Sequence, residues 1–364
     1  MQLREGEWLY SYCTLFDKNY LDKGLVLIES FRKYNDSGRI YILAMDDICY
    51  DILCSIGAEG IIPVKLADFE TDDLLEAKKN RSRGEYCWTC ASNFIFYVLQ
   101  TYGEECCTYI DADMCFYADP DVLIEEMIAK GKSVQIIEHR FRRNFAGKYQ
   151  QKISGRFCVE FNTFKNDKAG MEVLDTWRRQ ALEQCGFSYG TEKLGDQMYL
   201  DEWAEKYNCV HILENLGAGL APWNLNRYHY LKEDGQGIWL NFDKYPQPIK
   251  LVFFHYHDLN YLDRQHIDIR VHKRYWKLDM KLTSKLYEDY LCRLEEKKKW
   301  IEEHYGFCPL VQGNAVGVVN DKTRWERIKA LFCGNAYENI RIRLENHLKM
   351  FLFGKRDVID IGDK

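Results

Sequence analysis

The sequence predicts an α/β fold with a doubly wound sheet. Strand-like and helix-like patterns alternate through the first hundred residues, an order typical of parallel strands joined by crossover helices. Two carboxylates, in Asp111-Ala112-Asp113, directly follow the strand formers at 108–110. Ligands of doubly wound sheets bind at the ends of strands. We therefore expect a binding site at the end of this strand, in a chain long enough for one large core or two smaller ones.

Each element follows from periodicity and end signals. The opening β-α-β-α-β pattern comprises a strand at 8–14, a helix at 21–34, a strand at 39–45, a short helix at 47–56 and a strand at 61–62. An apolar helix at 88–102 then leads to the strand before Asp111. Further strands are expected at 133–137, 157–164 and 251–254, and further helices at 167–184, 196–207 and 275–305. Small residues at 217–223 predict a loop that lets the backbone approach a ligand.

Composition excludes several classes of protein. The chain has 364 residues, of which 46% are hydrophobic and 15% aromatic, so it is globular rather than disordered. A net charge of -6 disfavours a whole-protein nucleic-acid footprint. We expect a cytoplasmic protein, because the N-terminus lacks a signal-peptide pattern and no apolar run reaches about 18 residues. The 14 cysteines are then expected as free thiols, and Cys87 and Cys90 as helix packing rather than a zinc site.

The acidic triplet is the strongest chemical signal. Asp111 and Asp113 offer hard oxygen ligands one residue apart, which suits a divalent cation that in turn holds a diphosphate. The alternative is a solvated loop, but the apolar residues on both sides favour a metal site. The charged run at 78–83 is expected on the surface, with phosphate contacts from Arg81 or Arg83 as its alternative.

Four segments together resemble a known family. They are the turn Thr14–Tyr20, the triplet Asp111-Ala112-Asp113, Gly195-Asp196-Gln197, and a late strand ending in His255. In order and spacing, over residues 8–260, they resemble a GT-A glycosyltransferase. The resemblance is greatest to the family that contains glycogenin and bacterial lipo-oligosaccharide galactosyltransferases (family 8). It implies a Rossmann-like mixed sheet, flanked by helices, that binds a nucleotide sugar.

The resemblance also implies a role for each segment. Residues expected to hold the donor nucleotide are Thr14, Asp17, Asn19, Tyr20, Asp111 and Ala112. Residues expected to bind Mn²⁺ (or Mg²⁺) are Asp111, Asp113 and His255, with His257 in reserve. The donor would be a UDP-sugar. Asp196 and Gln197 are expected beside the transferred sugar as catalytic residues, and Asp196 is alternatively a helix N-cap.

Two departures from the family limit what the resemblance implies. The strand at 157–162 carries Cys158 where relatives have a polar group, so its sugar-binding role does not carry over. Residues 258–261 replace the Lys-Pro-Trp segment that often follows the late histidine. The family implies retention of anomeric configuration, but no nucleophile stands out, and Glu160 or Asp196 would serve as the base of an inverting variant.

The expected activity is metal-dependent glycosyl transfer to a saccharide or lipid-linked acceptor, in cell-surface polysaccharide synthesis. Two alternatives stay open at this point: an aspartate-dependent phosphatase or phosphotransferase, and a non-catalytic nucleotide-sugar-binding protein. In phosphatases the acidic triplet normally closes the first strand, whereas here several elements precede it.

The chain is expected to divide into a catalytic domain at 1–265, a helical extension at 266–320 and a basic tail at 321–364. An apolar helical stripe in the tail comprises Tyr337, Ile340, Leu344, Leu348 and Phe351. Such a stripe either packs on its own domain or lies on an anionic membrane, here the inner face.

Overall fold

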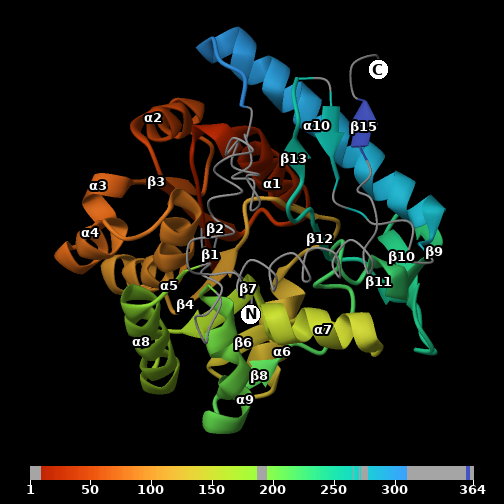
Figure 1. The fold of residues 1–364 in the computed structure, drawn as a ribbon, viewed down its shortest axis with the longest axis horizontal. Coiled ribbons are helices and arrows are strands. Elements are labelled where there is room, and N and C mark those ends of the chain that lie inside the picture. Colours follow the sequence, from red (N-terminus) through yellow and green to blue (C-terminus); the bar gives the residue numbers. More distant parts are fainter. Residues whose placement is uncertain are drawn as a thin grey trace, which may run out of the picture.

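The structure is a computed structural model that describes residues 10–186, 195–264, 266–269, 271 and 278–309, together with the backbone of 358–360. Its centre is a seven-stranded sheet with helices on both faces (Figure 1). The strand order is β3-β2-β1-β4-β7-β6-β8. The strands are β1 (Tyr10–Phe16), β2 (Gly38–Ala44), β3 (Ile61–Lys65), β4 (Cys106–Ile110), β6 (Val134–Glu138), β7 (Phe157–Lys165) and β8 (Val210–Ile212).

The sheet is mixed. The strands β3, β2, β1 and β4 run parallel, whereas β7 runs antiparallel to both of its neighbours, β4 and β6. The parallel β-α-β-α-β start and the predicted fold class, an α/β mixed sheet flanked by helices, are confirmed. Because β1 and β4 are parallel neighbours, the segments that follow them leave the sheet at the same edge.

Successive strand residues point to opposite faces and so enter two different cores. In β1, Tyr12 belongs to the core beneath α1 (Leu21–Tyr34), α2 (Asp47–Ile56) and α6 (Asp121–Ala129), and Cys13 to the other. That second core lies beneath α4 (Asp72–Lys78), α5 (Arg83–Tyr102) and α8 (Lys168–Glu183). The alternation explains why these strands read as continuous apolar runs: both faces are covered.

Helix α5 begins at Arg83, earlier than the predicted start at residue 88. Ser82 and Glu85 form a capping box, which satisfies free backbone N–H groups and starts the helix within the charged run. Cys87 and Cys90 lie in this helix, and every cysteine in the described residues is a free thiol. The predicted helix at 196–207 is instead a 3-10 helix, η2 (Gln197–Glu202), followed by a short α9 (Trp203–Lys206).

Smaller elements complete the body. They are α3 (Leu66–Phe69), α7 (Phe145–Ser154), the ribbon of β5 (Met114–Phe116) with β12 (Phe253–His255), the sheet of β9 (Tyr228–Asp234), β10 (Gly237–Phe242) and β11 (Ile249–Lys250), and the 3-10 helices η1 (Lys18–Tyr20) and η3 (Leu225–Arg227). The ribbon is antiparallel and pairs His255 with Met114. It lies outside the central sheet and joins the late strand to the segment after the acidic triplet.

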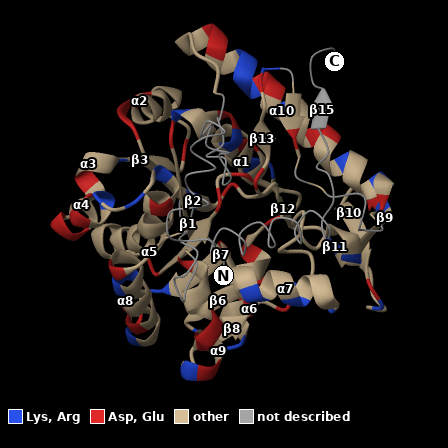
Figure 2. Cartoon of the chain, in the orientation of Figure 1, with Lys and Arg blue, Asp and Glu red and all other residues tan. Residues whose placement is uncertain are grey.

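Helix α10 (Met280–Tyr305) lies within the predicted helical extension and packs beside α1 (Figure 1). Acidic and basic residues alternate along it (Figure 2), while its buried residues, such as Leu286 and Tyr290, join a third core. In a small antiparallel sheet, β14 (His266–Asp268) pairs with both β13 (Asn260–Tyr261) and β15 (Val358–Asp360). The predicted apolar stripe of the tail lies outside the described residues. Among the described helices, none is long and apolar enough to cross a membrane.

Candidate metal and donor site

The acidic triplet connects β4 to β5 and is held by backbone hydrogen bonds from two directions. The Asp111 N–H donates to the carbonyl of Glu160 in β7, at 3.3 Å. The Tyr256 N–H donates to the carbonyl of Asp113, at 2.9 Å. The second bond and the β5–β12 pairing bring the end of the late strand against the triplet.

This arrangement gathers three of the predicted metal ligands. Nε2 of His255 lies 3.0 Å from Oδ1 of Asp113 and 3.6 Å from Oδ2 of Asp111. One ligand atom from each of the three residues falls within 4.8 Å of the others. The side chain of Asp111 is 28% exposed, whereas those of Asp113 and His255 are 10% and 2% exposed. The cluster is therefore most open to solvent at Asp111.

A further carboxylate lies behind His255. Glu160 is fully buried in β7, and its Oε2 lies 2.6 Å from Nδ1 of His255. Its other oxygen, Oε1, has no hydrogen-bond partner within the described part of the chain. Cys158, Glu160 and His255 form a second group whose ligand atoms also lie within 4.8 Å of one another, and all three residues are buried.

Burial and mutual charge set the protonation of the cluster. Burial raises the pKa of Asp111 to about 8; the His255 ring opposes this rise, and the Asp113 carboxylate adds to it. Burial also favours the neutral form of Asp113, but the charge and hydrogen bond of His255 hold its pKa below the usual value. Burial opposes charge on His255, yet Asp113 and Glu160 raise its pKa well above the ordinary range. Without a cation, a charged imidazole between two carboxylates is the favoured state.

The donor set fits a divalent cation. Two carboxylates supply the oxygen ligands that Mn²⁺ and Mg²⁺ prefer, and the imidazole nitrogen favours Mn²⁺ because Mg²⁺ takes mainly oxygen ligands. Two ligands at about 2.1 Å on opposite sides of an ion lie about 4.2 Å apart, which the spacing of the three ligand atoms allows. Asp111, Asp113 and His255 are thus the residues that would hold the ion.

The first turn leaves the same edge of the sheet as the triplet. Asp17 caps η1 by accepting hydrogen bonds from the N–H groups of Asn19 and Tyr20, and its second oxygen pairs with Arg83. Burial raises the pKa of Tyr20, and the carboxylates of Asp113, Asp258 and Asp111 add to the rise.

Two neighbours of this turn are buried polar groups. Thr14, in β1, is fully buried, and its hydroxyl has no hydrogen-bond partner in the described residues. Lys23, fully buried in α1, places its ammonium 4.1 Å from the centre of the Tyr20 ring and donates to the carbonyl of Leu259 at 2.9 Å. The Lys23 side chain thus lies beside the first turn and the loop after His255.

Asp196 and Gln197 lie at the start of η2. Asp196 is at the N-cap position but makes no capping hydrogen bond with its side chain. Burial raises its pKa to about 7, and its charge adds to the rise in the pKa of Asp111. Gln197 donates from Nε2 to the carbonyl of Ser154 at 2.6 Å. The Asp196 carboxylate therefore does not cap η2, and hydrogen bonds from the backbone N–H groups of Asp196 and Gln197 oppose the effect of burial on its pKa.

His257 does not join the three-residue cluster. The chain turns after His255, and Asp258 takes a positive φ of 60°, so residue 257 does not continue the strand. The His257 ring is exposed and lies 5.3 Å from the ring of His255 between centres. Trp223 packs edge-on against both histidines, at 5.4 and 5.2 Å, and its Nε1 donates to the carbonyl of His139.

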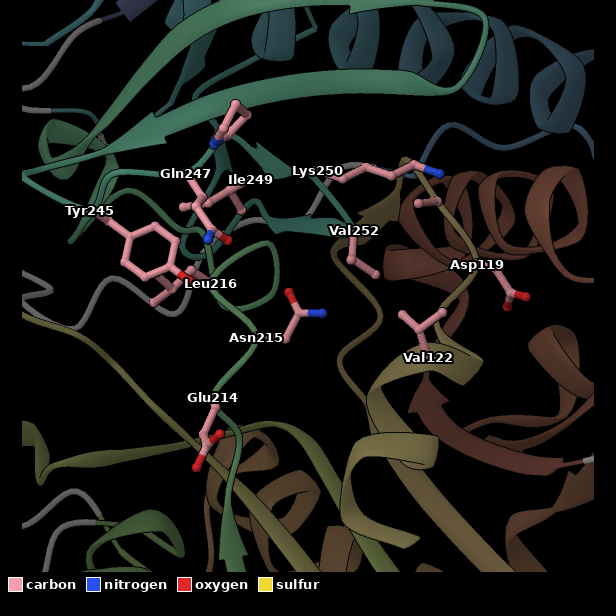
Figure 3. A pocket seen from close by; sticks show the side chains of 12 residues that line it. Asp119, Val122, Glu214, Asn215, Leu216, Tyr245, Gln247, Ile249, Lys250 and Val252 are labelled. Atoms are coloured by element: carbon pink, nitrogen blue, oxygen red, sulfur yellow. The ribbon is translucent and has the colours of Figure 1, made fainter. Parts of the chain in front are cut away.

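A separate cavity of about 440 Å³ contains none of the predicted site residues (Figure 3). Asp119, Asn215, Tyr245 and Lys250 are among its lining residues. The cavity is therefore distinct from the cluster of Asp111, Asp113 and His255.

Glu160, Lys23 and Trp223 were not predicted from the sequence to lie at the metal site. A signal existed for Glu160, which is a carboxylate in the middle of an apolar strand. Lys23 lies on a helix face that otherwise reads as core, and Trp223 lies in the loop that was expected to approach a ligand. Lys23 and Trp223 reach the site only because α1 and the loop at 217–223 pack against the strand ends.

No protein-family model matches the chain. Two uncharacterized proteins of Bacillus subtilis are similar to it along most of their length. YfnD is 28% identical over 298 residues, which is 81% of this chain and 90% of YfnD. YfnF is 28% identical over 302 residues, which is 81% of this chain and 96% of YfnF.

The similar solved structures include three glycosyltransferases. Mouse xyloside xylosyltransferase 1 has a TM-score of 0.42 and 12% identity, over 68% of this chain and 98% of that one. The glycosyltransferase GlyE of Streptococcus pneumoniae has a TM-score of 0.39 and 14% identity, over 59% of this chain and 47% of that one. The galactosyltransferase LgtC, in complex with donor and acceptor sugar analogs, has a TM-score of 0.39 and 13% identity, over 59% of this chain and 76% of that one. These are members of the class that the sequence motifs resemble.

Proposed function

We propose that the protein is a metal-dependent glycosyltransferase that moves a sugar from a nucleoside-diphosphate donor to a saccharide or lipid-linked acceptor. The observation that carries the proposal is the convergence of Asp111, Asp113 and His255 at one point. These residues come from two segments far apart in the sequence, and they include the acidic triplet of the family that the motifs resemble. A buried carboxylate–imidazole cluster open on one side suits a cation that must still accept a substrate.

Donor binding is assigned to the edge of the sheet where β1 and β4 end. Asp111, Asp113 and His255 would hold a divalent cation there, and that cation would supply positive charge to offset the negative charge of a departing nucleoside diphosphate. The Tyr20 ring would stack on the base, and the turn Asp17–Tyr20 would hold the ribose through its polar groups. Mn²⁺ and a UDP-sugar are the cofactor and donor that we propose.

The transferred sugar is assigned to the side of Asp196. Its buried carboxylate has no capping role and so can accept hydrogen bonds from sugar hydroxyls. Gln197 keeps its amide oxygen for a ligand while its Nε2 is bound to Ser154. We do not propose Glu160 as a base, because it is fully buried and hydrogen-bonded to His255. Retention of configuration, implied by the resemblance, is the stereochemical outcome we propose.

One assay separates this activity from its two alternatives. The full chain is incubated with a panel of UDP-sugars, and separately with p-nitrophenyl phosphate, each with and without Mn²⁺, and UDP and inorganic phosphate are both measured. UDP release that requires Mn²⁺ and disappears in Asp113→Asn supports the proposal. Phosphate release from p-nitrophenyl phosphate without UDP release supports a phosphatase. Thermal stabilisation by UDP with Mn²⁺ but no turnover supports a non-catalytic binding protein.

A further inference from the structure

We propose that Glu160 is a positioning residue that orients His255 and determines which of its ring nitrogens faces the metal. This inference rests on the proposed function, because it concerns the same metal centre. It adds a residue on β7, the strand whose sugar-binding role in the family does not carry over to this chain.

The geometry places two carboxylates on opposite sides of one imidazole ring. Glu160 Oε2 lies 2.6 Å from Nδ1, and Asp113 Oδ1 lies 3.0 Å from Nε2. A proton held on Nδ1 by Glu160 leaves the lone pair of Nε2 directed into the gap between Asp111 and Asp113. Metal-binding histidines usually donate their second N–H to a carboxylate or carbonyl, which fixes the ring and makes the ligand nitrogen more basic.

The surroundings of Glu160 exclude a direct role with substrate. Its side chain is fully buried, so it acts only through the groups it touches. Gly219, with a positive φ of 74°, closes the space beside it. A Cβ at residue 219 would lie 2.8 Å from Cδ1 of Ile137 and 3.4 Å from Oε1 of Glu160. The Glu160 carboxylate is therefore enclosed between the loop that contains Gly219 and strand β6, and it is hydrogen-bonded to His255.

The test measures Mn²⁺ affinity of the purified full chain, without donor, from the electron paramagnetic resonance signal of free Mn²⁺. Glu160→Met removes the acceptor at similar volume and is expected to weaken binding about 100-fold, the upper range for loss of such a partner. Glu160→Asp withdraws the carboxylate by one methylene and is expected to weaken binding at least about tenfold. Glu160→Gln keeps an oxygen that accepts from Nδ1, so it should retain part of the affinity that Glu160→Met loses.

A matched control lies on the same strand. Asn162 is fully buried, two residues along β7, and its side chain has no hydrogen-bond partner in the described residues. Asn162→Ala perturbs the packing of β7 without touching the Nδ1 contact, so its Mn²⁺ affinity should stay within about twofold of wild type. Glu160→Gln and Glu160→Asp keep the comparison available if Glu160→Met does not fold.

Three outcomes overturn the positioning role, and they are distinguishable from one another. If wild type binds Mn²⁺ and Asp113→Asn does not, but Glu160→Asp and Glu160→Met bind like wild type, only the role of Glu160 is wrong. If wild type binds no Mn²⁺, the metal centre and the proposed function are wrong as well. If two equivalents of Zn²⁺ bind and Cys158→Ser removes one, Glu160 is a ligand of a second site rather than a positioning residue.

Discussion

Nε2 of His255 lies 3.0 Å from Oδ1 of Asp113, although the two residues belong to segments that are far apart in the chain. The contact depends on the antiparallel pairing of β5 with β12, which sets His255 opposite Met114. A shift of that register by one residue would turn the histidine to the other face of the ribbon. The metal centre is therefore a property of this pairing as much as of the acidic triplet.

Asp113→Asn should abolish metal-dependent turnover while the fold stays intact. The substitution keeps the shape of the side chain but removes a charged ligand, and the loss of several kcal/mol of transition-state stabilisation corresponds to at least about 100-fold in rate. UDP release in Mn²⁺ measures the effect, and circular dichroism measures the fold. Asp243→Asn, on an exposed residue with a positive φ that Asn tolerates, is the control. A wild-type rate in Asp113→Asn would show that the site is wrong.

Tyr20→Ala should weaken donor binding by about 1 to 3 kcal/mol, the usual contribution of a base stacked on an aromatic ring. Tyr20→Phe keeps the ring and should bind nearly as well as wild type. Calorimetric titration with UDP in the presence of Mn²⁺ measures both affinities. Equal affinity of Tyr20→Ala and wild type would contradict the stacking role, and equal weakening of both variants would assign the contact to the hydroxyl.

Asp196→Asn should lower kcat about 100-fold while Mn²⁺ affinity stays within about twofold of wild type. The reason is that the charge of Asp196 acts on Asp111, but Asp196 is not one of the three residues whose ligand atoms converge. Glu202→Gln, on an exposed residue at the end of the same 3-10 helix, is the control. Loss of Mn²⁺ binding in Asp196→Asn would instead make Asp196 part of the metal site.

Ionisation of the buried Asp121 carboxyl group should make the protein less stable as the pH rises. Burial raises the pKa of this carboxyl to about 6, and Tyr12 donates a hydrogen bond to it at 2.5 Å. Because the folded pKa lies above the unfolded value of about 3.9, the folded state favours the protonated form. The stabilisation is fully present below that unfolded value and is lost as the pH rises through about 6.

Asp121→Asn removes this titration but keeps an oxygen that accepts from Tyr12. The free energy of unfolding of the variant, minus that of wild type, should therefore increase by about 2 kcal/mol between pH 4 and pH 7. Urea unfolding at several pH values measures the difference. A difference that stays constant with pH would show that the Asp121 pKa is not raised in the folded protein.

The sequence by itself determined the elements whose signals are local. The apolar periodicity and caps of α1 and α2, and the alternation of strands and helices before β4, predicted the parallel half of the sheet. The same local reasoning placed Asp111 and Asp113 after a buried strand. It did not predict the early start of α5, because the charged run before residue 88 obscured the Ser82 capping box.

The tertiary structure alone decided which side chains meet. The antiparallel direction of β7 brings Glu160 behind His255, and the turn at Asp258 separates His257 from the cluster. Neither fact leaves a periodic pattern in the sequence, because strand order, direction and register depend on contacts between distant segments. Periodicity and caps are encoded within a few residues, whereas a site built from β4, β7 and β12 exists only once those strands have packed together.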